Sequence, residues 1–202
     1  MPTNFRVHAA GAFAGLIMAG CLMMAVGVGA DSRTIVEEST GTKFDEMTRS
    51  DGRAYRCLGV GVRKLAFVTV YALAFCVDAA HADTAVSDYV KKHHAGLRGK
   101  PLAEALQKDS RFFETLAQTK HSRLVILKMQ RNVSQNQLRS TLRRSLSSLV
   151  PEAKLDELDA AITKGAKKGQ VVTISAAGPK LTVNVAGEVN VVDDADVARN
   201  LF

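Results

Sequence analysis

Arg63 is the residue whose type and position point most directly to ligand chemistry. It closes the segment Gly59-Val60-Gly61-Val62-Arg63, and the apolar stretch Leu65–Val77 begins two residues later, with Thr69 and Tyr71 as its only polar members. A guanidinium offers a planar fork of N–H donors that suits an anion. Because a buried charge without a partner is costly, Arg63 must lie at a water-filled opening or meet an anion.

The stretch Leu65–Val77 is dense in aromatic and β-branched residues, which predicts a buried β-strand. It is too short for a helix that crosses a bilayer, which takes about 20 apolar residues. Gly59 and Gly61 do not indicate a dinucleotide-binding loop, since that motif needs a third glycine and a following helix. We therefore expect Arg63 at the end of a strand at 53–63, followed by a turn around residues 64–66 and the strand at 65–77.

The remaining patterns predict an α+β fold with an antiparallel sheet, because strands lead, helices cluster in the middle and strands return. Further strands are expected at 34–44, 124–129, 171–175 and 181–185, the last two joined around Gly178-Pro179. Helical spacing marks residues 84–118, 134–149, 155–162 and 193–202. Ser134 and Gln137 have the spacing of a capping box, and the helix that they open carries Leu138 and Leu142 on its apolar stripe.

Residues 1–30 are expected to form a leader in front of a single domain at 31–202. The leader holds no acidic residue, Ala9 to Ala30 is uncharged, and Val28-Gly29-Ala30 supplies the small residues of a signal-peptidase site. A cleaved signal for export or for an organelle is the first interpretation. A retained membrane anchor is the alternative, because the uncharged stretch is long enough to span a bilayer.

The charge of the chain indicates only a mild preference for anionic partners. The 202 residues carry a formal net charge of +7 at pH 7, which a solvated surface explains. A basic group without interleaved aromatic residues does not predict nucleic-acid binding; its members are Lys128, Arg131, Arg139, Arg143 and Arg144.

Cysteine and histidine residues give no sign of a metal site or a catalytic group. Cys57 and Cys76 flank the expected hairpin, and they either pair in an oxidising compartment or pack as buried thiols. His93 and His94 are adjacent and are expected on the surface, since neighbouring residues of a helix point in different directions. His121 has no cysteine or carboxylate nearby in the sequence. We expect neither a metal nor a cofactor.

The order of these segments resembles the chalcone-isomerase-like superfamily, in which a G-x-G-x-R segment leads into an apolar strand with a V-Y-A-type centre. Here that centre is Val70-Tyr71-Ala72. The resemblance extends to TGTKF near residue 40, to RLVILKMQRNVSQNQLRSTLRRSL at 123–146 and to the closing DVARNLF, and covers most of residues 35–202. It implies an open-faced sandwich, with an antiparallel sheet packed against a layer of helices.

The resemblance also implies a binding site for a fatty acid. Fatty-acid-binding members hold a carboxylate with an arginine and a tyrosine from this region, which Arg63 and Tyr71 match. The two would lie roughly 26 Å apart on one straight strand, at about 3.3 Å per residue. A turn at residues 64–66 would place Tyr71 opposite a residue around Leu58, not opposite Arg63. The expected apolar wall of the pocket consists of Phe67, Tyr71, Leu73, Phe75, Leu138 and Leu142.

True chalcone isomerases cyclise a chalcone with an arginine, a threonine, a tyrosine and an asparagine. Arg63 matches the arginine, but Tyr71, Leu138 and Ser145 stand at the other three positions. Leucine can neither donate a proton nor orient water. The expected function is therefore non-catalytic binding of a fatty acid or similar acyl carboxylate, with no catalytic residue assigned. The alternatives are an isomerase (intramolecular lyase) with a rearranged site, and a structural domain that contacts a membrane through residues 9–30.

Overall fold

The computed structural model describes residues 33–65 and 67–202. The leader expected at residues 1–30 lies outside this part of the chain. Within it, no helix is both long enough and apolar enough to cross a membrane.

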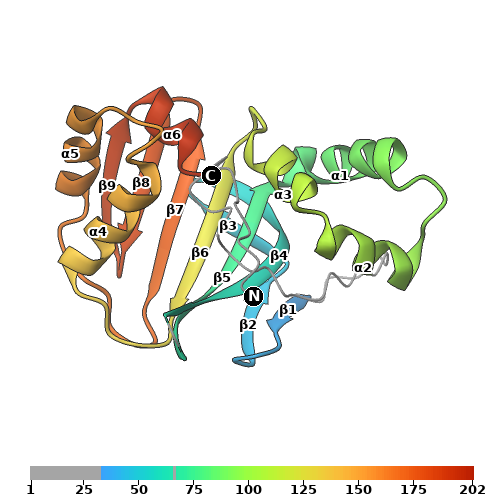
Figure 1. Ribbon diagram of the computed structural model, residues 1–202, viewed down its shortest axis with the longest axis horizontal. Coiled ribbons are helices and arrows are strands. Elements are labelled where there is room, and N and C mark those ends of the chain that lie inside the picture. The colour runs from blue at the N-terminus through green and yellow to red at the C-terminus, as the bar shows by residue number, and fades with distance from the viewer. Residues whose placement is uncertain (1–32, 66) are drawn as a thin grey trace, which may run out of the picture.

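Seven strands form one antiparallel sheet whose spatial order follows the order along the chain. The strands are β3 (Met47–Ser50), β4 (Arg53–Leu65), β5 (Val68–Asp78), β6 (Arg123–Met129), β7 (Val171–Ala177), β8 (Lys180–Val185) and β9 (Glu188–Asp193). The sheet curls into a half-barrel (Figure 1). This confirms the expected α+β class with an antiparallel sheet.

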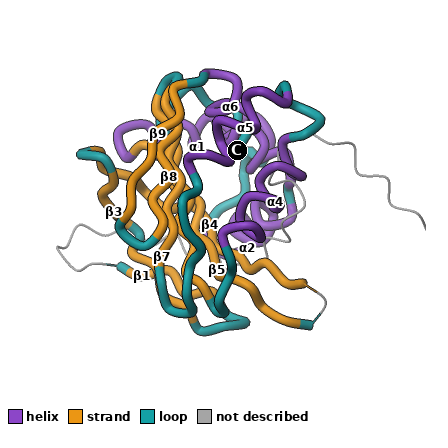
Figure 2. Tube along the Cα trace, turned by 90° about the vertical axis from the view of Figure 1, so that its left-hand side faces the viewer, coloured by secondary structure: helices purple, strands orange, loops and turns teal. Residues whose placement is uncertain are grey.

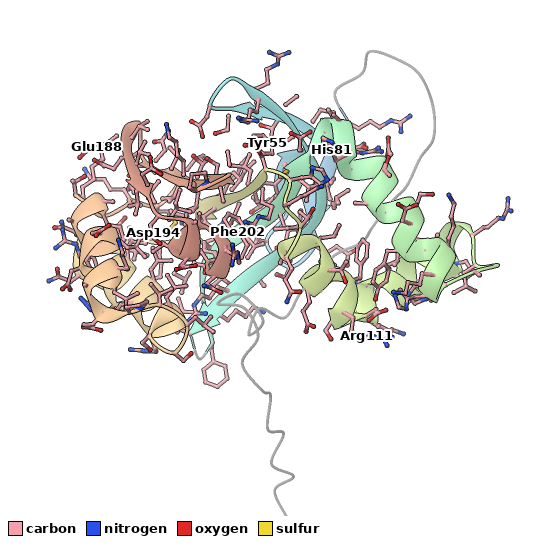
Figure 3. All side chains as sticks on the ribbon, turned by 90° about the horizontal axis from the view of Figure 1, so that it is seen from above. Tyr55, His81, Arg111, Glu188, Asp194 and Phe202 are labelled. Carbon is pink, nitrogen blue, oxygen red and sulfur yellow. A yellow bond between two sulfur atoms is a disulfide. The ribbon has the colours of Figure 1, made fainter. Side chains whose placement is uncertain are left out.

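Helices enter at two connections of the sheet and close the chain. Between β5 and β6 lie α1 (Ala79–His93), α2 (Gly99–Lys108) and α3 (Ser110–Ala117), and between β6 and β7 lie α4 (Gln135–Leu146) and α5 (Glu152–Ala161), with α6 (Ala195–Asn200) after β9. The first three form an arm on the right of Figure 1, and the other three gather on the left. Figure 3 accordingly places Arg111 of α3 and Glu188 of β9 on opposite sides of the molecule.

The predicted capping box fixes the start of α4. Ser134 Oγ accepts a hydrogen bond from the backbone N–H of Gln137 at 3.2 Å, and Gln137 Oε1 accepts one from the N–H of Ser134 at 2.9 Å. Each side chain thereby satisfies a donor that the first helical turn leaves open. This cap sets the position of Leu138 and Leu142 relative to the sheet.

The two faces of the sheet are covered differently. The helical face carries the larger core, to which α1 to α6 all contribute. The other face carries a smaller core around Phe44, Tyr55 and Cys57, which a separate hairpin of β1 (Thr34–Glu37) and β2 (Thr42–Asp45) covers. In Figure 2, α4 and α5 lie to one side of the strands β7, β8 and β9. Residues of β4 and β5 that face the helices are therefore available to a site between the two layers.

Three sequence predictions need correction. The single strand expected at 34–44 is the hairpin β1–β2, because the Glu37 carboxylate accepts hydrogen bonds from Ser39 and Thr40 and so stabilises a turn. The edge strand β3 was not predicted, although Asp51-Gly52 is a typical turn sequence and both residues have positive φ. The terminal helix expected at 193–202, with Asp193 or Asp194 as its cap, is α6 with Asp194 as its cap, but Asp193 ends β9, a strand that was not predicted.

Candidate functional site

The β4–β5 hairpin places Arg63 directly opposite Tyr71. The expectation that Tyr71 lies opposite a residue around Leu58 is therefore wrong. Leu65 and Val68 are the last pair of the hairpin, so the strands end later than predicted, and the pairing shifts by one residue between Arg63 and Lys64. Val70 is the extra residue of this β-bulge, a feature that re-aims side chains. The offset brings Arg63 and Tyr71 within cross-strand distance, about 4.5–5.5 Å between Cβ atoms.

On its helical side, β4 carries few side chains ahead of Arg63. The register pairs Gly59 with Phe75 and Gly61 with Leu73, so the glycines alternate with residues of the opposite face such as Val60. Glycine places no side chain between this part of β4 and the helices. After Gly59 and Gly61, Arg63 is therefore the first residue of β4 to place a large polar side chain on the helical face.

A cavity of about 120 Å³ lies between the sheet and α4, with Arg63 and Tyr71 in its wall. Most of its surface is apolar, and its polar members come from three places: the hairpin, the β6–α4 connection and α4. The lining residues are Arg63, Leu65, Val70, Tyr71, Leu127, Met129, Arg131, Val133, Gln137, Leu138, Thr141, Leu142, Ile162, Val172, Ile174, Val183 and Val185. No Asp, Glu, His or Cys occurs among these described residues, so the cavity has cations at its wall and no acid to neutralise them.

Arg63 and Tyr71 both keep hydrogen-bond donors available. Within the described chain, neither the Arg63 guanidinium nor the Tyr71 hydroxyl has a hydrogen-bond or salt-bridge partner. Tyr71 is 7% exposed, whereas Arg63 is half-buried. Burial raises the pKa of the Tyr71 phenol, and the nearby Arg63 charge opposes part of that rise. The phenol therefore stays protonated at neutral pH and can donate to an anion beside Arg63.

The structure divides the predicted wall residues into three groups. Tyr71, Leu138 and Leu142 line the cavity together with Arg63. Leu73 and Phe75 belong to the core on the same face, but not to the lining. Phe67 was wrongly assigned to the wall: it lies in the hairpin turn and is fully exposed. Its even spacing from Tyr71 and Leu73 predicts a shared face only if the strand begins before it, and β5 begins at Val68.

Sequence reasoning missed the second arginine and the floor of the cavity. Arg131 lies at the mouth because Gln130 N–H donates to Val70 O at 2.9 Å, which continues the β5–β6 pairing to this point. Gln137 and Thr141 project from α4 one turn apart. The floor comes from alternate residues of β7 and β8, and the alternating pattern of both strands carried this signal. Its members are Val172, Ile174, Val183 and Val185.

His94 is not a surface residue, contrary to expectation. Its Nε2 lies 3.0 Å from Asp109 Oδ2, which also accepts a hydrogen bond from Tyr89 at 2.7 Å. Burial favours a raised pKa for Asp109, but hydrogen bonds from Tyr89, Arg111 and His94 outweigh it and hold that pKa below its usual range. The cluster joins α1 to α3 in the helical arm. It lies outside the cavity, and the described residues contain no group of three or more potential metal ligands.

His121 has a partner that sequence distance concealed. Its ring stacks on His81 with 3.7 Å between centroids, and His81 Nδ1 lies 3.1 Å from Asp78 Oδ1. Of the basic group noted in the sequence, Arg143 on α4 forms ion pairs with Glu152, Asp156 and Asp159 of α5.

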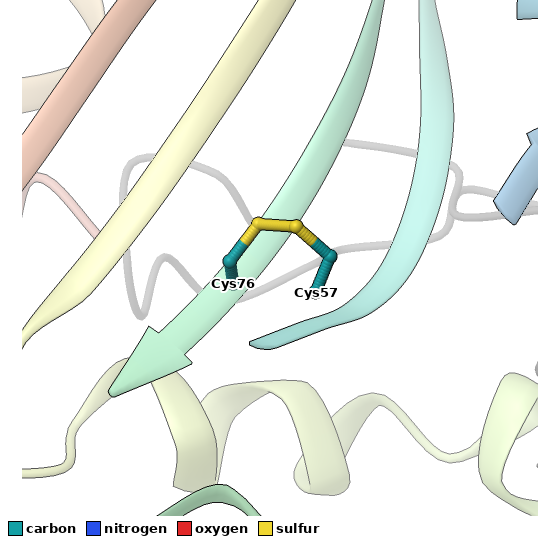
Figure 4. The surroundings of a disulfide bond; sticks show 2 residues. All are labelled: Cys57 and Cys76. Atoms are coloured by element: carbon teal, nitrogen blue, oxygen red, sulfur yellow. A yellow bond between two sulfur atoms is a disulfide. The ribbon is translucent and has the colours of Figure 1, made fainter. Parts of the chain in front are cut away.

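Cys57 and Cys76 form a disulfide between β4 and β5 (Figure 4). The two residues are direct cross-strand partners, on the face opposite the helices. The sequence left open whether these cysteines pair or pack as buried thiols, and in the structure they pair. The bond ties together the two strands that present Arg63 and Tyr71.

Comparison with known proteins identifies the fold. No protein-family model and no curated protein sequence matches the chain. Among solved structures, a fatty-acid binding protein of Arabidopsis thaliana (AtFAP1) is similar with a TM-score of 0.61, over 84% of this chain and 86% of that one. The sequences are 18% identical, so the likeness concerns the fold. The curled antiparallel sheet with its helices is therefore an α+β fold that this chain shares with the Arabidopsis protein.

Proposed function

We propose that the protein binds a fatty acid or similar small apolar carboxylate, without catalysis, in the cavity between the sheet and α4. One observation carries this proposal: Arg63 and Tyr71 face each other across the hairpin, line an apolar cavity and have no partner for their donors within the described chain. The name of the structurally similar Arabidopsis protein supports the same ligand class.

Arg63 is the proposed anchor for the carboxylate. A charged hydrogen bond contributes about 1.5–3 kcal/mol, and a half-buried guanidinium is screened less by water than an exposed one. Tyr71 adds a second donor, and its hydrogen bond to the charged carboxylate also contributes about 1.5–3 kcal/mol. No described acid in the lining competes for either group.

The acyl tail would extend over the apolar floor of β7 and β8, under Leu138 and Leu142. Each buried methylene contributes about 0.8 kcal/mol, so the tail supplies most of the affinity. The cavity of about 120 Å³ is smaller than the roughly 300–1,000 Å³ of typical ligand pockets. A long chain therefore requires α4 to move outward, and the half-buried state of Leu138 and Leu142 makes that helix the side that can yield.

An isomerase with a rearranged site is the second candidate. It is favoured by Gln137 and Thr141, which add an amide and a hydroxyl to the cavity although Leu138 stands where chalcone isomerases have a tyrosine. Mixing the protein with naringenin chalcone tests this candidate. A rate equal to that of spontaneous cyclisation excludes it, and a faster rate that Thr141→Val abolishes establishes it in place of passive binding.

We further propose that the protein works in an oxidising compartment, reached through the leader at residues 1–30. The disulfide supports this location, because such bonds persist in exported proteins and are rare in reducing cytosol. Terminal sequencing of the mature protein tests it: a new N-terminus near Asp31 indicates a cleaved signal. An intact N-terminus in a membrane fraction indicates that residues 9–30 act as an anchor.

Native mass spectrometry of the purified protein tests the ligand proposal. We expect adducts with fatty-acid masses on the wild type, fewer on Arg63→Ala, and an unchanged level on Arg49→Ala, which removes an exposed arginine on β3 outside the cavity. The absence of co-purifying fatty acid, together with unchanged binding of added laurate by Arg63→Ala, would refute the proposal.

A further inference from the structure

The tip of the β4–β5 hairpin exposes large apolar side chains. Phe67 is 101% exposed, and the flanking Leu65 and Val68 are 54% and 49% exposed. In Figure 2 the hairpin projects beyond the neighbouring strands. Contiguous exposed apolar residues of this kind mark a surface that meets a protein or a membrane.

Cations surround the same tip. Lys64 lies in the hairpin, and Arg131 follows Gln130, which bonds to Val70. Lys167 and Lys168 are brought alongside because Lys168 N–H donates to Asn132 Oδ1 at 2.9 Å and Gly169 N–H donates to Met129 O at 2.8 Å. Within the described chain, none of these four cations forms an ion pair. Their side chains are all exposed.

The segments that build this end of the sheet contain no acid. Neither aspartate nor glutamate occurs in residues 52–77, 121–151 or 160–187. The neighbouring β1–β2 hairpin adds the carboxylates of Glu37 and Glu38 and the ammonium of Lys43, so the four cations around the tip still leave this end of the molecule positive. The tip therefore combines an apolar point with a positively charged surround.

We propose that this hairpin tip docks on the surface of an anionic phospholipid bilayer. Phe67, Leu65 and Val68 enter the interface while Lys64, Arg131, Lys167 and Lys168 meet the headgroups, the arrangement by which peripheral proteins bind such surfaces. A protein partner fits less well, because three side chains on a projecting turn offer far less than the roughly 800 Å² per partner of a stable protein interface.

Docking brings the mouth of the cavity to the bilayer. Leu65 and Arg131 belong both to the tip and to the lining beside Arg63. A fatty acid could then pass between bilayer and cavity without crossing water. This exchange rests on the proposed function, whereas docking itself does not.

A tryptophan reporter tests docking directly, because the chain has no tryptophan of its own. Full-length Phe67→Trp is mixed with vesicles of phosphatidylcholine, with or without phosphatidylglycerol. We expect a blue shift of its emission, and quenching by brominated lipid, with the anionic vesicles. Val191→Trp, at an exposed position of β9, is the matched control. It should show neither change, even if residues 1–30 attach the protein to the vesicle.

A second experiment removes two of the cations that surround the tip. In Phe67→Trp background, the pair Lys167→Gln and Lys168→Gln should weaken vesicle binding roughly 10-fold or more, at about 1 kcal/mol per cation. An unshifted Phe67→Trp spectrum with anionic vesicles overturns the proposal. So does a blue shift that grows with protein concentration without lipid, which identifies a second copy of the chain as the partner. Laurate binding is measured separately, so either proposal can fail alone.

Discussion

At the scale of single residues, the central feature is a pair of donors that one β-bulge brings together. Arg63 and Tyr71 are eight positions apart in the chain but directly opposite in the sheet. Arg131 adds a second charge at the mouth, where it is exposed, whereas Arg63 is half-buried. A less solvated charge binds an anion more strongly, so the two arginines are not equivalent.

Substitutions at the three positions should therefore rank in a fixed order. Tyr71→Phe removes only the hydroxyl that donates to the carboxylate and should weaken laurate binding about 10-fold, the equivalent of about 1.5 kcal/mol. Arg131→Ala should have an effect of similar size or smaller, and Arg63→Ala the largest. Isothermal titration calorimetry measures the order. A larger loss for Arg131→Ala than for Arg63→Ala would place the carboxylate at the mouth instead.

The sequence predicted the chemistry of this site better than its geometry. The type of Arg63, the apolar strand and the Ser134 cap were all readable, because each depends on local preference. The cross-strand partner of Tyr71 could not be predicted, because the register of the hairpin depends on a bulge at Val70. The sequence between the two strands also lacks the residues typical of a tight turn. Phe67 was misplaced for the same reason. The edge strand β3 was missed although Asp51-Gly52, just after it, is a readable turn signal.

At the scale of elements, α4 is the wall of the cavity that we propose moves outward for a long acyl chain. Leu142 is half-buried in that wall, facing the β7–β8 floor across a cavity of about 120 Å³. Leu142→Phe should fill part of this space. Because the position is only half-buried, the added volume should cost less than the roughly 1–3 kcal/mol of a well-packed core.

We expect Leu142→Phe to shift ligand preference toward shorter chains. Binding of laurate should fall at least 10-fold, while binding of hexanoate should change little. Calorimetry with both acids measures the ratio. Equal losses for the two acids would mean that the tail does not pass under α4.

The arm of α1 to α3 depends on the carboxylate of Asp109, whose side chain is 9% exposed. Its folded-state pKa lies below its usual value, so ionised Asp109 stabilises the fold above about pH 4. That contribution disappears as pH falls below this value. Asp109→Asn should lower the free energy of unfolding by about 2 kcal/mol at pH 7 and flatten its dependence between pH 4 and 2. Urea unfolding across that range measures it. If the free energy of unfolding depends on pH equally in Asp109→Asn and in the wild type, ionised Asp109 does not stabilise the arm.

At the scale of the whole molecule, the disulfide links stability to the compartment. Cys57 and Cys76 are 19 residues apart, and closing a loop of that size contributes about 3 kcal/mol to folding in the chain-entropy model. Reduction should therefore lower the free energy of unfolding by about this amount. Urea unfolding with and without a reductant measures the loss. The variant with Cys57→Ala and Cys76→Ala should match the reduced protein and should not respond to reductant.

The curled sheet explains how strands far apart in the chain come to line one cavity. Because strand order follows chain order, β4 and β5 lie near one side of the cavity while β7 and β8, more than a hundred residues later, form its floor. Sequence patterns predicted each of these strands. Their meeting around one cavity follows from the curl of the sheet, which no local pattern encodes.

Titration of two matched ligands into two proteins tests the central claim most directly. Laurate and 1-dodecanol share an apolar tail, but only laurate carries a carboxylate. We predict that Arg63→Ala weakens laurate binding roughly 10- to 100-fold, as expected for a charged hydrogen bond, and leaves dodecanol binding unchanged. Equal affinities of the wild type and Arg63→Ala for laurate, or no binding of laurate by the wild type, would contradict the account.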